Sequence, residues 1–167
     1  MQKIKKSKNR KAQAWGIDLM AASVIFIFGI IMFYLYALNE PSEGKEIVET
    51  MSYEGEFIAR SLLSEGYPSD WNSGNVIKIG ILSENKINQT KLERFYEIAA
   101  LDYEKTKRLF NTRFNYYFFL SEKITIDSDE VEGLGEKPEN YKNLFKVTRF
   151  TIYNNKPSTM TIYIWES

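Results

Sequence analysis

The hydrophobic pattern of the chain is dominated by one uninterrupted apolar stretch near the N-terminus, Leu19–Leu38, which contains no charged side chain. A helix of this length spans about 30 Å, which is the thickness of the hydrocarbon core of a bilayer. A core helix of a small soluble domain has a polar face, and this stretch has none. We therefore predict a transmembrane helix over residues 14–38, with the lipid bilayer as its surroundings.

Beyond the apolar stretch, the spacing of hydrophobic residues predicts a mixture of helices and strands. Period-3.6 spacing predicts helices, whereas β-branched and aromatic content or strict alternation predicts strands. Gly66 and Pro68 supply the breakers that end the first helix. The predicted elements are an amphipathic helix at Lys45–Ser64, a strand at Asn75–Leu82, a charged helix at Thr90–Asn111, a strand at Arg113–Ile126, and a terminal hairpin of Leu144–Tyr153 and Thr159–Trp165 around Asn154–Pro157.

The net charge of zero hides an asymmetry between the two sides of the apolar stretch. Residues 1–12 carry six basic side chains and no acid, and only one acid, Asp18, precedes residue 39. This leaves sixteen basic and twenty-one acidic side chains in residues 39–167, a net charge of −5. The positive-inside rule then predicts a cytoplasmic N-terminus and an extracytoplasmic acidic domain. The acidic domain argues against nucleic-acid binding.

The composition also limits the chemistry that the chain can perform. The 167 residues include no histidine and no cysteine. Their absence removes the commonest general base, the commonest metal ligand and every nucleophile of the Ser-His or Cys-His type. No set of catalytic side chains converges in the sequence, so we do not expect an enzyme, and we expect no cofactor.

The junction before the apolar stretch resembles a known processing signal. A basic cluster ending at Lys11 is followed by the small residue Ala12, then Gln13, Ala14, a short polar stretch with one acid, and the apolar residues. This order resembles the class III signal of archaeal type IV pilin-like proteins. The resemblance implies cleavage by a prepilin-type peptidase on the cytoplasmic side, and packing of the retained helix against other pilin-like subunits in a filament core.

Two cleavage positions remain open. Cleavage between Ala12 and Gln13 gives the expected small residue and Gln, and makes Asp18 the sixth mature residue. Cleavage between Gln13 and Ala14 makes Asp18 the fifth, the position at which the family's acid pairs with a neighbouring subunit's new amino terminus. From the residues alone, Asp18 fits two roles equally: a first-turn acid that complements the helix dipole, or a charge that binds a partner in an assembly.

A second resemblance lies at the end of the amphipathic helix, where Gly66, Pro68 and Trp71 form a Gly-x-Pro-x-x-Trp turn. Archaeal pilin-like membrane proteins often have this turn followed by a strand. We expect Trp71 to be a structural plug over the domain core rather than a platform for a ligand, since buried aromatic residues mostly pack.

Two further motifs lie in the acidic domain. Asn88-Gln-Thr90 is an N-glycosylation sequon, so Asn88 is a candidate modification site. Residues 127–132 concentrate four acids, which suggests either a calcium loop or a solvated loop between strands. The segment lacks the glycine and the bidentate acid of an EF-hand, so we expect no metal site.

Together these features predict an α+β protein with a basic cytoplasmic leader at 1–13, a transmembrane helix at 14–38 and an extracytoplasmic domain at 39–167. In the pilin-like lollipop that the resemblance implies, an amphipathic helix extends the membrane helix and packs on a small antiparallel sheet. The expected function is that of a structural subunit of an archaeal surface filament or pseudopilus. The alternative is a binding or accessory module tethered by an anchor that is neither processed nor polymerised.

Overall fold

The computed structural model describes the backbone of residues 9–38 and 43–166, and the side chains of residues 15–38 and 44–166. The chain divides into two compact units, Met1–Ser42 and Glu43–Ser167. In the first unit, the described residues form a single helix, α1 (Asn9–Leu38). Residues 1–8 of the predicted leader, and the predicted helix break at Pro41, lie outside the described residues.

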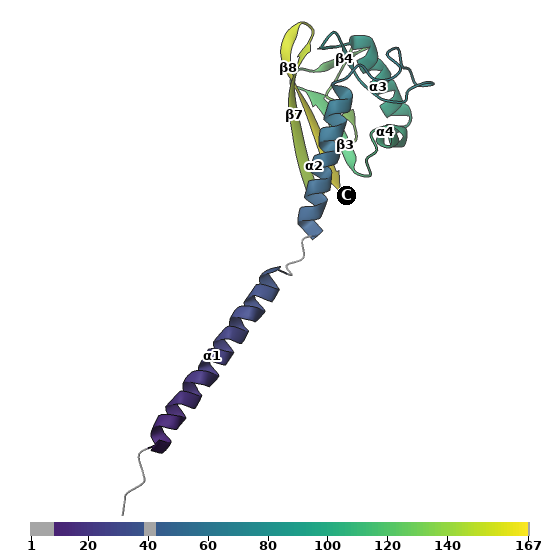
Figure 1. Cartoon of the computed structure of the whole chain (residues 1–167). Helices are drawn as coiled ribbons and strands as arrows, with labels where there is room; N and C mark the ends of the chain where they lie inside the picture. Colours follow the sequence, from purple (N-terminus) through teal and green to yellow (C-terminus); the bar gives the residue numbers. More distant parts are fainter. Residues whose placement is uncertain (1–8, 39–42, 167) are drawn as a thin grey trace, which may run out of the picture. The chain divides into compact units, whose positions relative to one another are not determined.

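The second unit has the predicted α+β class, with three helices and antiparallel strands in its described part (Figure 1). The helices are α2 (Glu43–Leu62), α3 (Gln89–Leu101) and α4 (Tyr103–Leu109). The strands are β1 (Leu82–Ser83), β2 (Lys86–Ile87), β3 (Asn115–Leu120), β4 (Ile124–Ile126), β5 (Asp129–Val131), β6 (Leu134–Gly135), β7 (Asn143–Tyr153) and β8 (Lys156–Glu166).

The central sheet is antiparallel, with strand order β6-β3-β8-β7, so β7 forms one edge. The predicted terminal hairpin is confirmed as β7 and β8, which pair from Asn143↔Glu166 to Tyr153↔Lys156. Asn154 and Asn155 alone make the turn, with φ of 51° and 60°, so Lys156 and Pro157 of the predicted turn belong to β8 instead. Two positive φ angles match the right-handed twist of a hairpin, and asparagine tolerates them better than most residues.

The predicted amphipathic helix is also confirmed, as α2, and it packs on the β7–β8 side of the sheet (Figure 1). Its fully buried apolar residues are Met51, Ile58, Ala59 and Leu62. Gly55 permits the close approach, because a Cβ there would lie 3.0 Å from Val147 Cγ2 and 3.2 Å from Ile164 Cγ2.

Helix α3 covers the same face of the sheet through an aromatic cluster. The Phe95 ring lies 5.9 Å from the Phe118 ring and 6.5 Å from the Tyr116 ring, measured between centroids. Tyr116 pairs with Ile164 and Phe118 with Ile162, the residues of β8 that face α2 and α3. Tyr103 and Leu109 of α4 pack against the same core, so all three helices contribute to it. Residues of β7 with the opposite parity, such as Lys146 and Phe150, lie on the other face of the sheet.

The predicted strand over Asn75–Leu82 is wrong, although its apolar residues are buried at Ile79 and Ile81. Its backbone groups bond to the end of α2 and the following loop instead of a sheet neighbour. Ile81 N donates to Leu62 O at 2.9 Å, and Ile79 O accepts from Ser61 Oγ at 2.8 Å. One isolated bridge, Tyr67↔Lys78, is the only strand-like pairing in that described segment before β1 begins at Leu82.

Two other predicted elements are each divided in the structure. The helix over Thr90–Asn111 becomes α3 and α4, because Asp102 leaves the helical conformation with φ −149° and ψ 78°. The strand over Arg113–Ile126 becomes β3 and β4, which belong to different sheets. Ser121 marks the break, where its amide donates to Thr159 O at 2.9 Å and the chain then leaves the central sheet.

Candidate membrane-spanning and assembly segment

Helix α1 presents apolar side chains around its whole circumference, and none of them is covered by the described chain. Every side chain from Trp15 to Leu38 is exposed, including Phe26 at 69% and Phe33 at 69%. The 24 residues from Trp15 to Leu38 form a helix of about 36 Å. The segment is thus long and apolar enough to cross a membrane, a criterion that a signal sequence near the N-terminus also meets.

Asp18 lies in the first turn of this apolar segment, and its side chain is exposed. No ion pair or hydrogen bond joins it to another residue in the described part of the chain. Ser23, one turn further on, is different, because its hydroxyl donates to Leu19 O at 2.8 Å and so satisfies itself within the helix. Asp18 is therefore the one charged residue between Trp15 and Leu38, and the described residues supply no partner for it.

The candidate processing residues Lys11, Ala12, Gln13 and Ala14 fall within the backbone of α1. Their side chains lie outside the described residues, so both cleavage positions stay predictions. The aromatic residues at the two ends of the segment, Trp15, Tyr34 and Tyr36, are exposed at 82%, 62% and 74%. Such amphipathic rings favour the two interfaces of a bilayer.

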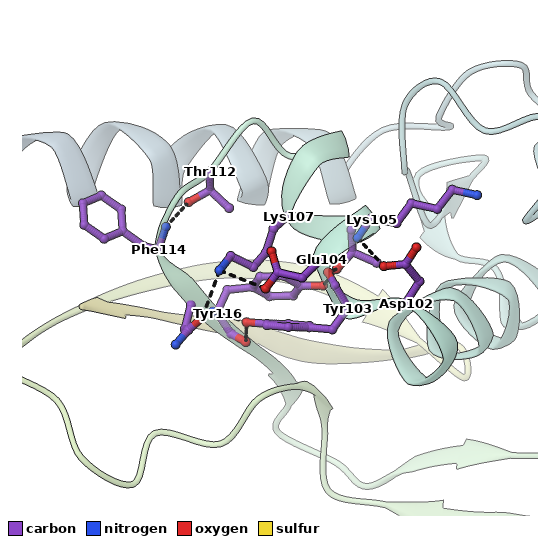
Figure 2. Close-up of polar contacts among 10 residues, drawn as sticks. Asp102, Tyr103, Glu104, Lys105, Lys107, Thr112, Phe114 and Tyr116 are labelled. Atoms are coloured by element: carbon purple, nitrogen blue, oxygen red, sulfur yellow. Dashed lines mark hydrogen bonds and ion pairs between the residues drawn. The ribbon is translucent and has the colours of Figure 1, made fainter. Parts of the chain in front are cut away.

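In the second unit, a cluster of polar side chains joins α4 to the beginning of β3 (Figure 2). The Tyr103 hydroxyl donates to Tyr116 O at 3.1 Å and accepts from Tyr116 N at 2.8 Å. The Tyr116 hydroxyl in turn bonds to Thr106 Oγ1. Burial raises the pKa of Tyr103 and of Tyr116 well above the ordinary tyrosine range. Both phenols stay protonated; Tyr103 satisfies backbone groups of β3 and Tyr116 bonds to a side chain of α4, so both have a structural role.

Trp71 is fully buried, as predicted for a plug over the core. Its indole Nε1 donates to Gly80 O at 2.9 Å, and Arg94 Nη1 donates to Trp71 O at 2.7 Å. The ring therefore fixes the loop that follows α2 and presents no free face to a ligand.

The acidic segment 127–132 is not a simple loop between strands, because Asp129–Val131 forms strand β5. Two of its four acids have lysine partners: Glu130 pairs with Lys123, and Glu132 pairs with Lys137. Among the described residues, no group of three or more acidic side chains is arranged to hold a metal ion.

Asn88, the candidate glycosylation site, is the N-cap of α3. Its Oδ1 accepts from Lys91 N at 3.1 Å, and the side chain is half-buried while Thr90 is exposed. Capping uses the amide oxygen and leaves the amide nitrogen, to which a glycan attaches, without a role in the cap. Modification at Asn88 stays a prediction.

Two exposed aromatic residues were not singled out from the sequence. Phe150 on β7 is 89% exposed, and Tyr53 on α2 is 74% exposed. The signal was present in the periodicity, because alternation places Phe150 opposite the buried face of Val147 and helical spacing places Tyr53 opposite the buried Met51–Ile58 side.

Comparison of the chain with protein-family models, with curated proteins and with solved structures gave no match in any of the three.

Proposed function

We propose that the chain is a pilin-like structural subunit of an archaeal surface filament or a related pseudopilus, and that it assembles through its N-terminal hydrophobic helix. One observation carries the proposal: Trp15–Leu38 is apolar on all sides, uncovered by the described chain, and contains a single acid at its beginning. In a membrane subunit, lipid covers the apolar side chains of such a helix. In a filament core, the same helices from other copies cover them.

The proposal gives the parts of the chain their places. The basic residues before Ala12 hold the N-terminus in the cytoplasm until a prepilin-type peptidase removes them. The acidic α+β unit lies on the outer side of the membrane. The role of this unit is assembly and not catalysis. Its buried phenols and paired acids support this proposal, because each of them stabilises the fold.

Asp18 distinguishes assembly from simple anchoring. In a core of packed apolar helices its carboxylate is withdrawn from water and needs a cation, such as the new amino terminus of an adjacent subunit. An unpaired member of a buried pair costs about 3–5 kcal/mol. That cost changes an assembly equilibrium more than about a hundredfold, at roughly 1.4 kcal/mol per decade. If Asp18 instead lies among the lipid headgroups and complements the helix dipole, it stabilises the helix by only about 0.3–1 kcal/mol.

The test is the ratio of subunit in sheared surface filaments to subunit in membranes, for wild type and for Asp18→Asn. We expect Asp18→Asn to insert and fold normally but to lose most of its incorporation into filaments. Ser23→Ala is the matched control, because Ser23 bonds only to Leu19 O of its own helix. An unchanged ratio for Asp18→Asn means that Asp18 only begins the helix. Absence of the wild type from any filament supports the tethered accessory module instead.

A further inference from the structure

Two exposed patches of matching chemistry lie on opposite faces of the second unit. The helix patch consists of Glu49, Tyr53 and Phe57 on the side of α2 that faces away from the sheet; Tyr53 is 74% exposed and Phe57 43% exposed. The strand patch consists of Lys146, Thr148 and Phe150 on the sheet face that α2 does not cover, and all three side chains are exposed.

The two patches lie at the same level of the unit. Glu56 of α2 forms an ion pair with Arg149 of β7, and Gly55 lies over Val147. Phe57 directly follows Glu56, and Phe150 directly follows Arg149, so the two phenylalanines lie next to the two partners of one ion pair. The order of chemistry is also the same along the two elements, from an exposed charge through a hydroxyl-bearing residue to a phenylalanine.

The spacings of the two patches agree as well. Glu49, Tyr53 and Phe57 recur every four residues on a helix, so the patch extends over about 12 Å. Lys146, Thr148 and Phe150 recur every two residues on a strand, which gives about 13–14 Å. The charges are opposite, and within the described residues neither Glu49 nor Lys146 has an ion-pair partner.

From this match we propose that the helix patch of one copy docks on the strand patch of the next copy of the same chain. Glu49 meets Lys146, Tyr53 meets Thr148, and Phe57 meets Phe150. The contact is heterologous, so an associated pair keeps one free helix patch on one copy and one free strand patch on the other, and the association stays open. No copy is turned end over end, so the N-termini of all the α2 helices point the same way.

This inference rests on the proposed function, because it assigns the contact between the outer units of neighbouring subunits. It also accounts for Phe150, whose large apolar side chain is left in water by the isolated unit. Exposed aromatic side chains beside complementary charges are typical of a protein interface.

The absence of cysteine from the chain permits a direct test with introduced pairs. The full chain carrying both Tyr53→Cys and Thr148→Cys is expressed in cells, and membranes and surface fractions are oxidised with copper phenanthroline. We expect a ladder of dimers, trimers and higher species. Each single variant alone gives no ladder, and a mixture of the two single variants gives dimers only, as an open head-to-tail contact requires.

Charge reversal then tests the pairing itself in the double-cysteine chain. Glu49→Lys or Lys146→Glu alone is expected to reduce the ladder about tenfold or more, the effect of placing like charges at an interface. Both reversals together restore it. Glu97→Lys, an exposed and unpaired acid on α3, is the matched control and leaves the ladder unchanged.

Two outcomes overturn the contact: no ladder from the double-cysteine chain, or equally strong dimers from Tyr53→Cys alone. The filament fraction of the same cells separates this result from the proposed function. Filaments without a ladder contradict only the contact, whereas a ladder in membranes without any filament supports the contact and contradicts the proposed function.

Discussion

Tyr116 illustrates how single residues set the pH behaviour of the folded unit. Its phenol is buried against Thr106, and burial raises its pKa above the value of about 10 that the unfolded chain has. Between those two values the unfolded state loses the phenol proton and the folded state keeps it. Unfolding then releases a proton, so the free energy of unfolding falls as pH rises above about 10, by roughly 1.4 kcal/mol per pH unit for this group.

The measurement is denaturant unfolding of the full chain in detergent between pH 8 and pH 11, for wild type and for Tyr116→Phe. We expect the free energy of unfolding of both proteins to be independent of pH between pH 8 and about pH 9.5. Above about pH 10, the free energy of unfolding of the wild type should decline more steeply than that of the variant. Tyr103→Phe should flatten the decline in the same direction, because burial also raises the pKa of Tyr103. Identical slopes for wild type and Tyr116→Phe contradict the account.

Single residues also show what sequence reasoning could and could not reach. The burial of Trp71 was predictable, because a large aromatic after a helix-breaking turn has few alternatives to packing. Its partner, Gly80 O, was not, since a loop contact nine residues away has no periodic signal. Asp18 was identified by its position, and its role stays a prediction, because no described residue pairs with it.

At the scale of elements, Asp102 divides what the hydrophobic pattern predicted as one helix. Its side chain accepts from Lys105 N at 2.8 Å, which caps the beginning of α4. Replacing an N-cap aspartate with alanine costs about 1 kcal/mol. For a unit of this size, Asp102→Ala is therefore expected to lower Tm by about 3–6 °C, measured by circular dichroism on the full chain.

Asp102→Asn is the matched control for that change, because asparagine caps as well as aspartate. It removes the charge opposite Arg108 Nη2, 3.6 Å away, and keeps the capping oxygen. We expect it to retain nearly the wild-type Tm, since exposed ion pairs contribute little. An equal loss in both variants assigns the effect to the ion pair and not to the cap.

Elements with a strong local period were predictable, and elements decided by distant partners were not. Strands β7 and β8 are rich in β-branched and aromatic residues on both sides of Asn154 and Asn155, so the hairpin was visible in the sequence, although its turn is shorter than the predicted Asn154–Pro157. The segment Asn75–Leu82 is rich in β-branched residues but has no neighbouring strand to pair with, because the end of α2 takes its hydrogen bonds. The β-branched composition of a segment indicates an extended conformation, but it does not indicate which segment will pair with it.

At the scale of the whole molecule, the chain joins two units that differ in how their apolar side chains are buried. The described part of Glu43–Ser167 buries its own core under three helices, whereas α1 leaves every described side chain uncovered. The coarse division was predictable, because an apolar run of this length stands out from the rest of the sequence. The surface patches on α2 and β7 required the register of the sheet, which a single sequence does not supply.

The mature N-terminal residue tests the central claim most directly, and intact-mass spectrometry of the protein purified from membranes and from surface material measures it. The account predicts a chain that begins at Gln13 or Ala14, with the twelve or thirteen preceding residues removed. Replacing Lys11 and Ala12 with bulky acidic residues should leave the precursor uncut. An intact Met1–Ser167 chain in wild-type membranes and surface material contradicts the claim and identifies the protein as a permanently tethered module.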